Sequence, residues 1–454
     1  MNTSFFGELL QTISERGRAL LARDRRGDAS ARSENLVELC EHLLSGRGEA
    51  SGVALAREIL TLYGTLTIGP RIAFFEALAQ RFGIDKARMD QAIDTWRASP
   101  SDTTAAEVHL ASEPRRQELF RRLNLAPGGT AALVRMREQL MDALDHRRDD
   151  FAAVDADFVH LFSSWFNRGF LVLRHIDWST PAIVLEKIIR YEAVHEIRGW
   201  DDLRRRIDPP DRRCYAFFHP ALVDEPLIFV EVALEREIPG AIAPILASGR
   251  QQFVEPDKAR IAVFYSISNC QRGLSGVSFG NFLIKQVVEE ICRELPKLTT
   301  FVTLSPVSGF ARWLDRELKA ESSSAISAND RIVFELLERP HWWTDPEIFS
   351  QLEDPLMRAA AWYFVRARNA RGGLVDPVAR FHLGNGARLE RINWLSDTSE
   401  RAIAQGYGVM VNYLYDLDDI EKNHEAYAEG PTVVASNSVQ RLLRPPLELV
   451  PIAG

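Results

Sequence analysis

Residues 260–310 read RIAVFYSISNCQRGLSGVSFGNFLIKQVVEEICRELPKLTTFVTLSPVSGF. An apolar strand (Ile261–Tyr265) leads into a glycine-bearing loop (271–280), and an amphipathic helix begins at Asn281. A second strand, Phe301–Leu304, follows that helix and runs directly into a serine and a proline. This strand–loop–helix–strand order predicts an α/β unit with its functional groups at the strand ends.

The loop between the first strand and the helix contains Gly273, Gly276 and Gly280. Glycine permits positive φ and close approach of a ligand to the backbone. Free N–H groups and the positive end of a helix dipole together suit a diphosphate. The glycine spacing matches neither the Walker nor the Rossmann pattern. An ordinary turn whose glycines only permit tight packing is therefore the alternative interpretation.

Ser305 lies at the end of the second strand and precedes Pro306. A residue before proline is biased to an extended conformation, which keeps the serine hydroxyl out of helix hydrogen bonding. The chain has no G-x-S-x-G elbow here, so a hydrolase nucleophile is not supported. A local turn contact remains the alternative role for this serine.

His382 lies in the segment RFHLGNGA, residues 380–387. If the segment is extended, the imidazole faces away from Phe381 and Leu383, and a Gly-Asn-Gly turn follows at once. Histidine titrates near neutral pH and can act as an acid or a base in a cleft. A partly buried or turn-flanking imidazole is the alternative interpretation.

Two further positions near the C-terminus are candidates for the same region. The last strand is predicted over Gly408–Leu414, and Tyr415 follows it directly. Tyr413 and Tyr415 are two residues apart, so their side chains should point to the same side. Such aromatic stripes are usually part of a core. Asn393 is polar among apolar neighbours and is expected to be a buried hydrogen-bonding residue.

Composition restricts the classes of partner and cofactor. The net charge of −8 provides no basic field for nucleic acid or an anionic membrane. The four cysteines are widely spaced, and the ten histidines form no HExxH pattern, which argues against disulfide frameworks and metal sites. No apolar run is long enough for a bilayer span, and no signal-peptide core is present, so we expect a cytoplasmic protein.

The 454 residues predict at least two domains. Residues 1–168 are predicted to form a helical bundle for oligomerisation or as a brace. Asp85 should cap a helix with Met89, Ile93 and Trp96 on one face, and Thr130 should cap another. In residues 169–454 strands and helices alternate, which indicates an α/β or α+β domain.

Four long segments carry a resemblance when they are taken in order: FYSISNCQRGLSGVSFGNFLIK, LSPVSGFARWL, FHLGNGARLERINW and GVMVNYLY. An earlier block, EAVHEIRGWDDLRRR followed by RRCYAFFHPALVDEPLIFVEVAL, also matches. The chain resembles the malonyl-CoA decarboxylase family, strongly over about residues 160–415 and more loosely before them.

The resemblance implies an α+β chain, with a helical N-terminal domain followed by a catalytic domain of the N-acetyltransferase (GNAT) fold. It assigns catalytic positions to Ser305 and His382 and places Tyr415 near them. It implies that the CoA diphosphate binds at the loop. The expected substrate-binding residues are Arg272, Gly273, Ser275, Gly276, Val277, Ser278, Phe279, Gly280, Asn281, Ser305, His382 and Asn393. Some relatives, including animal ones, have an acidic residue where this chain has Ser278.

The resemblance implies conversion of malonyl-CoA to acetyl-CoA and CO2 without a cofactor. A thioester can accept the electrons as an enolate, a protonated His382 would protonate C2, and Ser305 would orient the substrate. The family implies a homodimer or homotetramer. Two other functions stay open: a CoA-dependent acyltransferase of the same fold, and a non-enzymatic acyl-CoA sensor.

Overall fold

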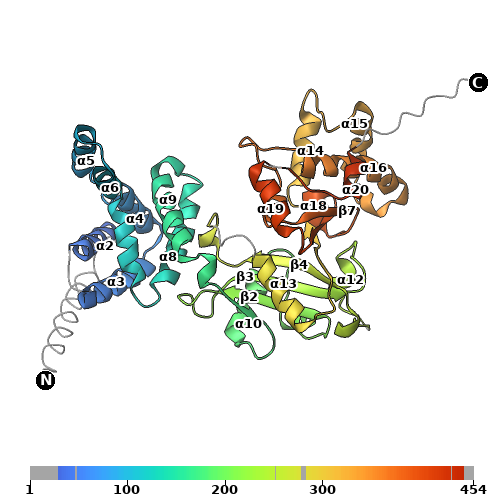
Figure 1. The fold of residues 1–454 in the computed structure, drawn as a ribbon, viewed down its shortest axis with the longest axis horizontal. Helices are drawn as coiled ribbons and strands as arrows, with labels where there is room; N and C mark the ends of the chain where they lie inside the picture. Colours follow the sequence, from blue (N-terminus) through green and yellow to red (C-terminus); the bar gives the residue numbers. More distant parts are fainter. Residues whose placement is uncertain (1–28, 46–48, 251, 278–282, 431, 444–454) are drawn as a thin grey trace, which may run out of the picture. The chain divides into compact units, whose positions relative to one another are not determined.

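The computed structural model describes residues 29–45, 49–250, 252–277, 283–430 and 432–443, and these form two compact units (Figure 1). The helical unit contains the chain up to Phe170 together with His219–Val223 and Gln271–Phe279, of which residues 271–277 are described. The sheet unit contains Leu171–Phe218, Asp224–Cys270 and the chain from Gly280 onward.

The helical unit packs its helices around an aromatic core. Phe120 and Phe158 stack with ring centroids 4.1 Å apart, and Phe162 contacts both Phe158 and Phe166. The helices are α2 (Ala29–Leu44), α3 (Glu49–Gly64), α4 (Ile68–Gln80), α5 (Lys86–Ala98), α6 (Asp102–Ala111), α7 (Arg115–Asn124), α8 (Gly129–Leu144) and α9 (Arg148–Trp165), followed by the 3-10 turn η2 (Arg168–Phe170).

One of the two predicted helix caps in this unit is confirmed. The Asp85 side chain accepts the N–H of Arg88 at the start of α5. The prediction for Thr130 is wrong, because α8 begins at Gly129 and the Thr130 hydroxyl instead bonds to the Asn124 side chain, with 2.7 Å between oxygens.

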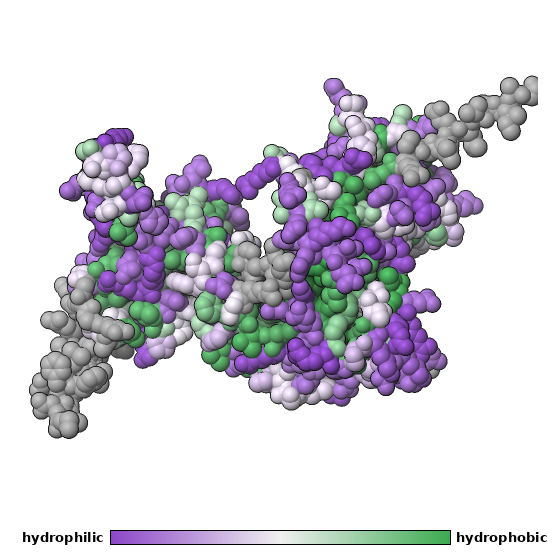
Figure 2. Space-filling view, in the orientation of Figure 1, coloured by the Kyte–Doolittle hydropathy of each residue, from purple (hydrophilic) through white to green (hydrophobic). Residues whose placement is uncertain are grey.

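The apolar face predicted for α5 is only partly buried, because Met89 and Ile93 are half-buried and Trp96 is exposed. The Trp96 side chain is 43% exposed, and Leu110 on the neighbouring α6 is 55% exposed. In Figure 2 the part of the surface formed by α5 and α6 is mostly pale or hydrophilic, with small hydrophobic spots. Helical spacing identified the shared face, but spacing alone does not determine what covers it.

The sheet unit is built on eight strands in the order β1-β2-β3-β4-β5-β8-β6, with β7 pairing on β8. All pairs are antiparallel except β4 with β5. The strands are β1 (Val172–His175), β2 (Arg212–Phe218), β3 (Pro226–Glu235), β4 (Ile261–Asn269), β5 (Thr300–Thr303), β6 (Ser305–Pro306), β7 (Arg388–Asn393) and β8 (Met410–Tyr415).

Helices cover this sheet where their apolar residues meet it. Val184, Leu185 and Ile188 of α10 share a buried cluster with Ala216 of β2 and Phe229 of β3. The helices are α10 (Ala182–Tyr191), α11 (Trp200–Ile207), α12 (Ala243–Leu246), α13 (Leu283–Glu294), α14 (Phe310–Lys319), α15 (Ala328–Phe334), α16 (Pro346–Val365), α17 (Pro377–Gly384), α18 (Glu400–Gly406), α19 (Ile420–Glu429) and α20 (Asn437–Leu442), with 3-10 turns η3 (Pro256–Lys258), η4 (Arg272–Leu274), η5 (Glu335–Glu338) and η6 (Trp342–Thr344).

Strand β8 is the element that positions the candidate site. It pairs with β5, β6 and β7, so residues from four segments of the chain meet along it. Ser305 lies opposite Val411, and Phe301 lies opposite Tyr415. The order expected from the sequence, a helical domain followed by a domain of mixed strands and helices, is confirmed.

Candidate active site

Ser305 begins the short strand β6 directly after the parallel strand β5. Its side chain is nearly buried, with the residue 7% exposed. The Ser305 Oγ donates to Thr303 Oγ1 over 2.9 Å and lies 3.3 Å from His382 Nε2. The structure therefore brings two of the predicted residues together, 77 positions apart in the chain.

His382 lies in helix α17, and the extended conformation considered from the sequence is wrong. Asp376 caps this helix by accepting the N–H of Ala379, and Pro377 occupies its first turn. An Asp-Pro pair is a helix start signal, and it outweighs the alternation of apolar residues around the histidine. The imidazole is buried, with the residue 3% exposed.

Tyr415 and Tyr413 project from the same face of β8 toward this imidazole. The Tyr415 hydroxyl oxygen lies 2.8 Å from His382 Nδ1. The Tyr413 ring stacks on the imidazole, with centroids 4.6 Å apart and planes at 23°. Both tyrosines are buried, so they enclose the histidine on one side.

The environment of His382 favours an uncharged imidazole. Burial lowers the pKa of His382 to about 3, because the charged form loses its hydration. Burial likewise raises the pKa of Tyr415 above its ordinary value. Burial therefore favours the neutral forms of both groups, whereas the resemblance implies a protonated His382.

The hydrogen bonds indicate which imidazole nitrogen carries the proton. Ser305 uses its single hydroxyl proton on Thr303, so its oxygen can only accept from His382 Nε2. A neutral imidazole with a proton on Nε2 has a bare Nδ1, which accepts from the Tyr415 hydroxyl. We infer a chain of donors that runs from Tyr415 through His382 and Ser305 to Thr303.

Thr303 is a site residue that sequence reasoning missed. It is fully buried, and its Oγ1 accepts both the Ser305 hydroxyl and the N–H of Tyr413, the latter over 3.1 Å. Its carbonyl oxygen accepts from Asn412 Nδ2 over 2.8 Å. The available signal was its position two residues before Ser305, on the same face of the chain.

Asn393 is a buried hydrogen-bonding residue, as its neighbours indicated. Its Nδ2 donates to Asn412 Oδ1 over 2.8 Å and to the Met410 carbonyl over 3.4 Å. The same Asn412 oxygen also accepts from Arg391 Nε over 3.1 Å. Asn412 links the side chain of Asn393 to the Thr303 carbonyl oxygen. The hydrogen bonds of Asn393 are therefore made with other protein groups.

The glycine loop packs against helix α8 of the helical unit. A Cβ at Gly273 would lie 2.0 Å from the Val134 carbonyl oxygen, so only glycine fits there. Arg137 Nη1 donates to the carbonyl oxygens of Gly273 and Ser275 over 2.9 and 2.7 Å. Tight packing, the alternative interpretation of the glycines, therefore explains Gly273.

Gly276 has a different role in the loop. It adopts φ +77°, and a Cβ built on it would have no heavy atom within 4 Å. Gly276 and Ser275 are exposed, whereas Val277 is buried. The Arg272 guanidinium pairs with Asp142 over 2.6 Å, so an acidic neighbour balances its charge.

The predicted residues divide between the two compact units. Ser305, His382, Tyr415 and Asn393 belong to the sheet unit, and the loop from Arg272 to Val277 belongs to the helical unit. Ser278, Phe279, Gly280 and Asn281 lie outside the described residues. Within the described ranges, no three His, Cys, Asp or Glu side chains gather as metal ligands would.

Two family models match nearly the whole chain from residue 82 onward. The malonyl-CoA decarboxylase C-terminal domain matches residues 169–451, and the malonyl-CoA decarboxylase N-terminal domain matches residues 82–166. The chain belongs to the malonyl-CoA decarboxylase family. As a member of that family it is a carboxy-lyase.

Relatives of known name and structure agree with this membership. Mitochondrial malonyl-CoA decarboxylase of Anser anser anser is 37% identical over 418 residues, covering 84% of this chain and 82% of the relative. The crystal structure of the Rhodopseudomonas palustris malonyl-CoA decarboxylase is 56% identical, with a TM-score of 0.87. The match covers 90% of this chain and 99% of that structure. The crystal structure of the Cupriavidus metallidurans malonyl-CoA decarboxylase is 35% identical, with a TM-score of 0.69. The match again covers 90% of this chain and 99% of that structure.

None of the helices in the described ranges combines the length and the apolar character that a membrane span requires.

Proposed function

We propose that this chain converts malonyl-CoA to acetyl-CoA and CO2 without a cofactor. The observation that carries the proposal is the buried chain of hydrogen bonds through Tyr415, His382 and Ser305, in a member of this family. It provides a buried, positioned proton donor, which is what protonation of a carbanion requires.

The reaction needs no separate electron sink. When the bond between C2 and the carboxylate breaks, its electron pair passes to C2 and is shared with the thioester oxygen as an enolate. CO2 leaves uncharged. A hydrogen-bond donor at the thioester oxygen then stabilises the negative charge that develops there, and stabilises it more strongly in a site of low dielectric.

His382 delivers the proton to C2 from its neutral Nε2–H. The enolate of a thioester is a far stronger base than a phenolate, so the transfer is favourable overall. As Nε2 loses its proton, Nδ1 takes the proton of Tyr415, whose oxygen lies 2.8 Å away. After the product leaves, Nε2 takes a proton from solvent and Nδ1 returns its proton to Tyr415, which restores the starting state and accounts for the single proton that the reaction consumes. A neutral imidazole acting as a donor has precedent in other enzymes.

Ser305 orients the thioester. Its hydroxyl oxygen lies 3.3 Å from the Nε2 of His382. A hydroxyl rotates about its C–O bond, so the proton that Thr303 accepts in the free site can turn to the thioester oxygen of a bound substrate. An unactivated serine is a poor base near neutral pH, so we assign Ser305 a donor role.

The CoA diphosphate is assigned to the glycine loop, residues 275–281. Support comes from Gly276, whose left-handed backbone and open surroundings leave room for a ligand to approach the chain. Arg137 holds the loop through two carbonyl oxygens, which restricts its conformation before any ligand binds. We further propose that the enzyme is cytoplasmic and forms a homodimer or homotetramer.

The decisive experiment is incubation of the purified protein with malonyl-CoA and no added cofactor, after dialysis against a chelator. Mass spectrometry should detect acetyl-CoA and CO2 in equal amounts. Release of free CoA thiol only when an acceptor is added would instead identify an acyltransferase. Binding without turnover, unchanged in His382→Ala, would identify an acyl-CoA sensor.

A further inference from the structure

A large pocket of about 690 Å³ lies in the sheet unit beside the hydrogen-bonded chain. Its walls come from the segment after α10, the segment that begins α18, and the ends of β6 and α17. Pro306 follows Ser305, and Val378 lies one helical turn before His382, and both line the pocket. A group bound in this pocket would therefore reach the walls next to the serine and the histidine.

Most charged groups in the pocket wall already have partners. Glu192 accepts the hydroxyls of Ser266 and Ser268 and the N–H groups of Val194 and His195. The Asp397 carboxylate accepts the N–H of Ser399 over 3.0 Å.

The cationic side of the wall is less completely paired. Arg206 pairs with the buried Glu231 over 2.8 Å. Arg401 differs, because no carboxylate lies within ion-pair distance of it among the described residues. Its Nη2 donates to the Ala193 carbonyl oxygen over 2.9 Å. Arg401 is an exposed residue, and this bond ties one end of its guanidinium to the pocket wall.

The His195 ring adds a buried nitrogen that lacks a hydrogen-bond partner among the described residues. It is 8% exposed and lines the same pocket, and its Nε2 has no hydrogen-bond partner within the described chain. Burial, and then the charge of Arg206, lower the pKa of His195 to about 4, so the ring is neutral near pH 7. A buried polar nitrogen of this kind needs a partner, which a ligand or a water molecule supplies.

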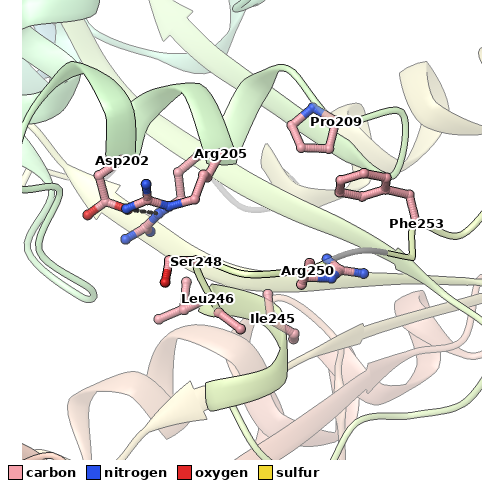
Figure 3. A pocket seen from close by; sticks show the side chains of 10 residues that line it. Asp202, Arg205, Pro209, Ile245, Leu246, Ser248, Arg250 and Phe253 are labelled. Atoms are coloured by element: carbon pink, nitrogen blue, oxygen red, sulfur yellow. Dashed lines mark hydrogen bonds and ion pairs between the residues drawn. The ribbon is translucent and has the colours of Figure 1, made fainter.

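A second, smaller pocket of about 90 Å³ shares Arg206 and Leu246 with the first and shows the contrast (Figure 3). Arg205 pairs with Asp202 over 3.0 Å, and Arg250 pairs with the buried Asp211 over 2.8 Å beneath the ring of Phe253. Each arginine there has a carboxylate. The larger pocket therefore differs from the smaller one in containing an arginine, Arg401, that has no carboxylate within ion-pair distance among the described residues.

We propose that Arg401, with His195 beside it, binds the carboxylate of the acyl group and so selects malonyl thioesters over acetyl thioesters. The inference rests on the proposed function, which places a carboxylate next to Ser305 and His382. A guanidinium suits it, because its planar N–H groups match the two carboxylate oxygens.

The ion pair has a defined consequence for catalysis. The carboxylate loses its charge as CO2 forms, so its bond to Arg401 stabilises the bound substrate more than the transition state. Loss of Arg401 should therefore raise KM about 10-fold, the scale of one charge-assisted hydrogen bond, while kcat does not fall. A residue that only supported the fold would lower kcat or the melting temperature instead.

The test measures binding by calorimetry in the His382→Ala background, where malonyl-CoA should not be consumed. Arg401→Gln should weaken malonyl-CoA about 10-fold and leave acetyl-CoA within about twofold. Arg401→Lys should recover part of the lost affinity, because lysine keeps the positive charge but lacks the planar N–H groups that bind two carboxylate oxygens. His195→Phe, which keeps ring volume without the nitrogens, should also weaken malonyl-CoA selectively.

Arg198→Gln is the matched control, because Arg198 lines the same pocket and is exposed like Arg401 but has the Glu196 carboxylate 3.7 Å away. It should leave both affinities within about twofold. Equal loss of both ligands in Arg401→Gln, or loss of neither, would overturn the inference. A wild-type protein that does not consume malonyl-CoA would contradict the proposed function, whereas the comparison of the two ligands would still report on the carboxylate site.

Discussion

The hydroxyl of Tyr415 lies 2.8 Å from Nδ1 of His382. Tyr415 ends strand β8 and His382 lies in helix α17, 33 residues earlier in the chain. Both side chains are buried, and the opposite imidazole nitrogen faces Ser305 at 3.3 Å. The histidine is thus held at both nitrogens, which sets its orientation and its tautomer together.

Tyr415→Phe removes the proton that the relay returns to His382 but keeps the ring. We expect kcat to fall by at least about 10-fold, within the range for a proton-transfer group, with KM little changed. Steady-state kinetics with malonyl-CoA would measure this. Tyr413→Phe is the control, because the Tyr413 ring stacks on the imidazole without bonding to it. Equal loss in both variants would contradict the relay.

The pH dependence should lack the acid limb of an ordinary histidine. Burial lowers the pKa of His382 to about 3, and in the proposed mechanism the neutral form is the active one. Protonation therefore removes activity only near pH 3, and kcat/KM should stay level across about pH 5 to 8, on both sides of the usual histidine pKa of about 6.5. A resting imidazolium would instead make kcat/KM fall about 10-fold per pH unit above its pKa.

His382→Ala and Ser305→Ala should each lower kcat by at least about 10²-fold, since each removes a positioned proton donor. Binding of acetyl-CoA should persist in both, because neither side chain is assigned to the coenzyme. Rapid-quench measurement of acetyl-CoA would give the rates. A Ser305→Ala enzyme as fast as wild type would show that the serine neither orients the thioester nor holds the imidazole.

Thr303→Val should lower kcat about 10-fold through misplacement of Ser305, with KM unchanged. Valine has the same shape but cannot accept the Ser305 hydroxyl or the N–H of Tyr413. Thr303→Ser keeps the accepting oxygen and should recover most of the rate. If both variants lose activity to the same extent, the methyl group rather than the hydroxyl is what matters.

Two glycines of the loop should respond differently to alanine. Gly273→Ala should destabilise the protein by about 2–3 kcal/mol, because the new Cβ meets the Val134 carbonyl. Gly276→Ala should cost about 1 kcal/mol through its positive φ and should also weaken acyl-CoA binding. Denaturant titration and calorimetry would measure these effects. Gly64→Ala, with open space around it, serves as the unaffected control.

The sequence was informative wherever a local pattern decides the outcome. The strand at Ile261, the strand at Phe301 and the cap at Asp85 depend on neighbouring residues, and the structure contains each of them. The resemblance pointed to the family through long ordered segments. His382 was placed in the wrong element because an apolar alternation was weighed above the Asp-Pro helix start.

Sequence alone thus determined which residues carry polar and titratable groups, the order of the elements and the family to which the chain belongs. The meeting of Thr303, Ser305, His382 and Tyr415 was decided by tertiary structure, because β8 pairs with strands distant in the chain. The lowered pKa of His382 was decided there too. A pKa depends on the loss of hydration around a group, and hydration is lost only when the remote segments have packed together.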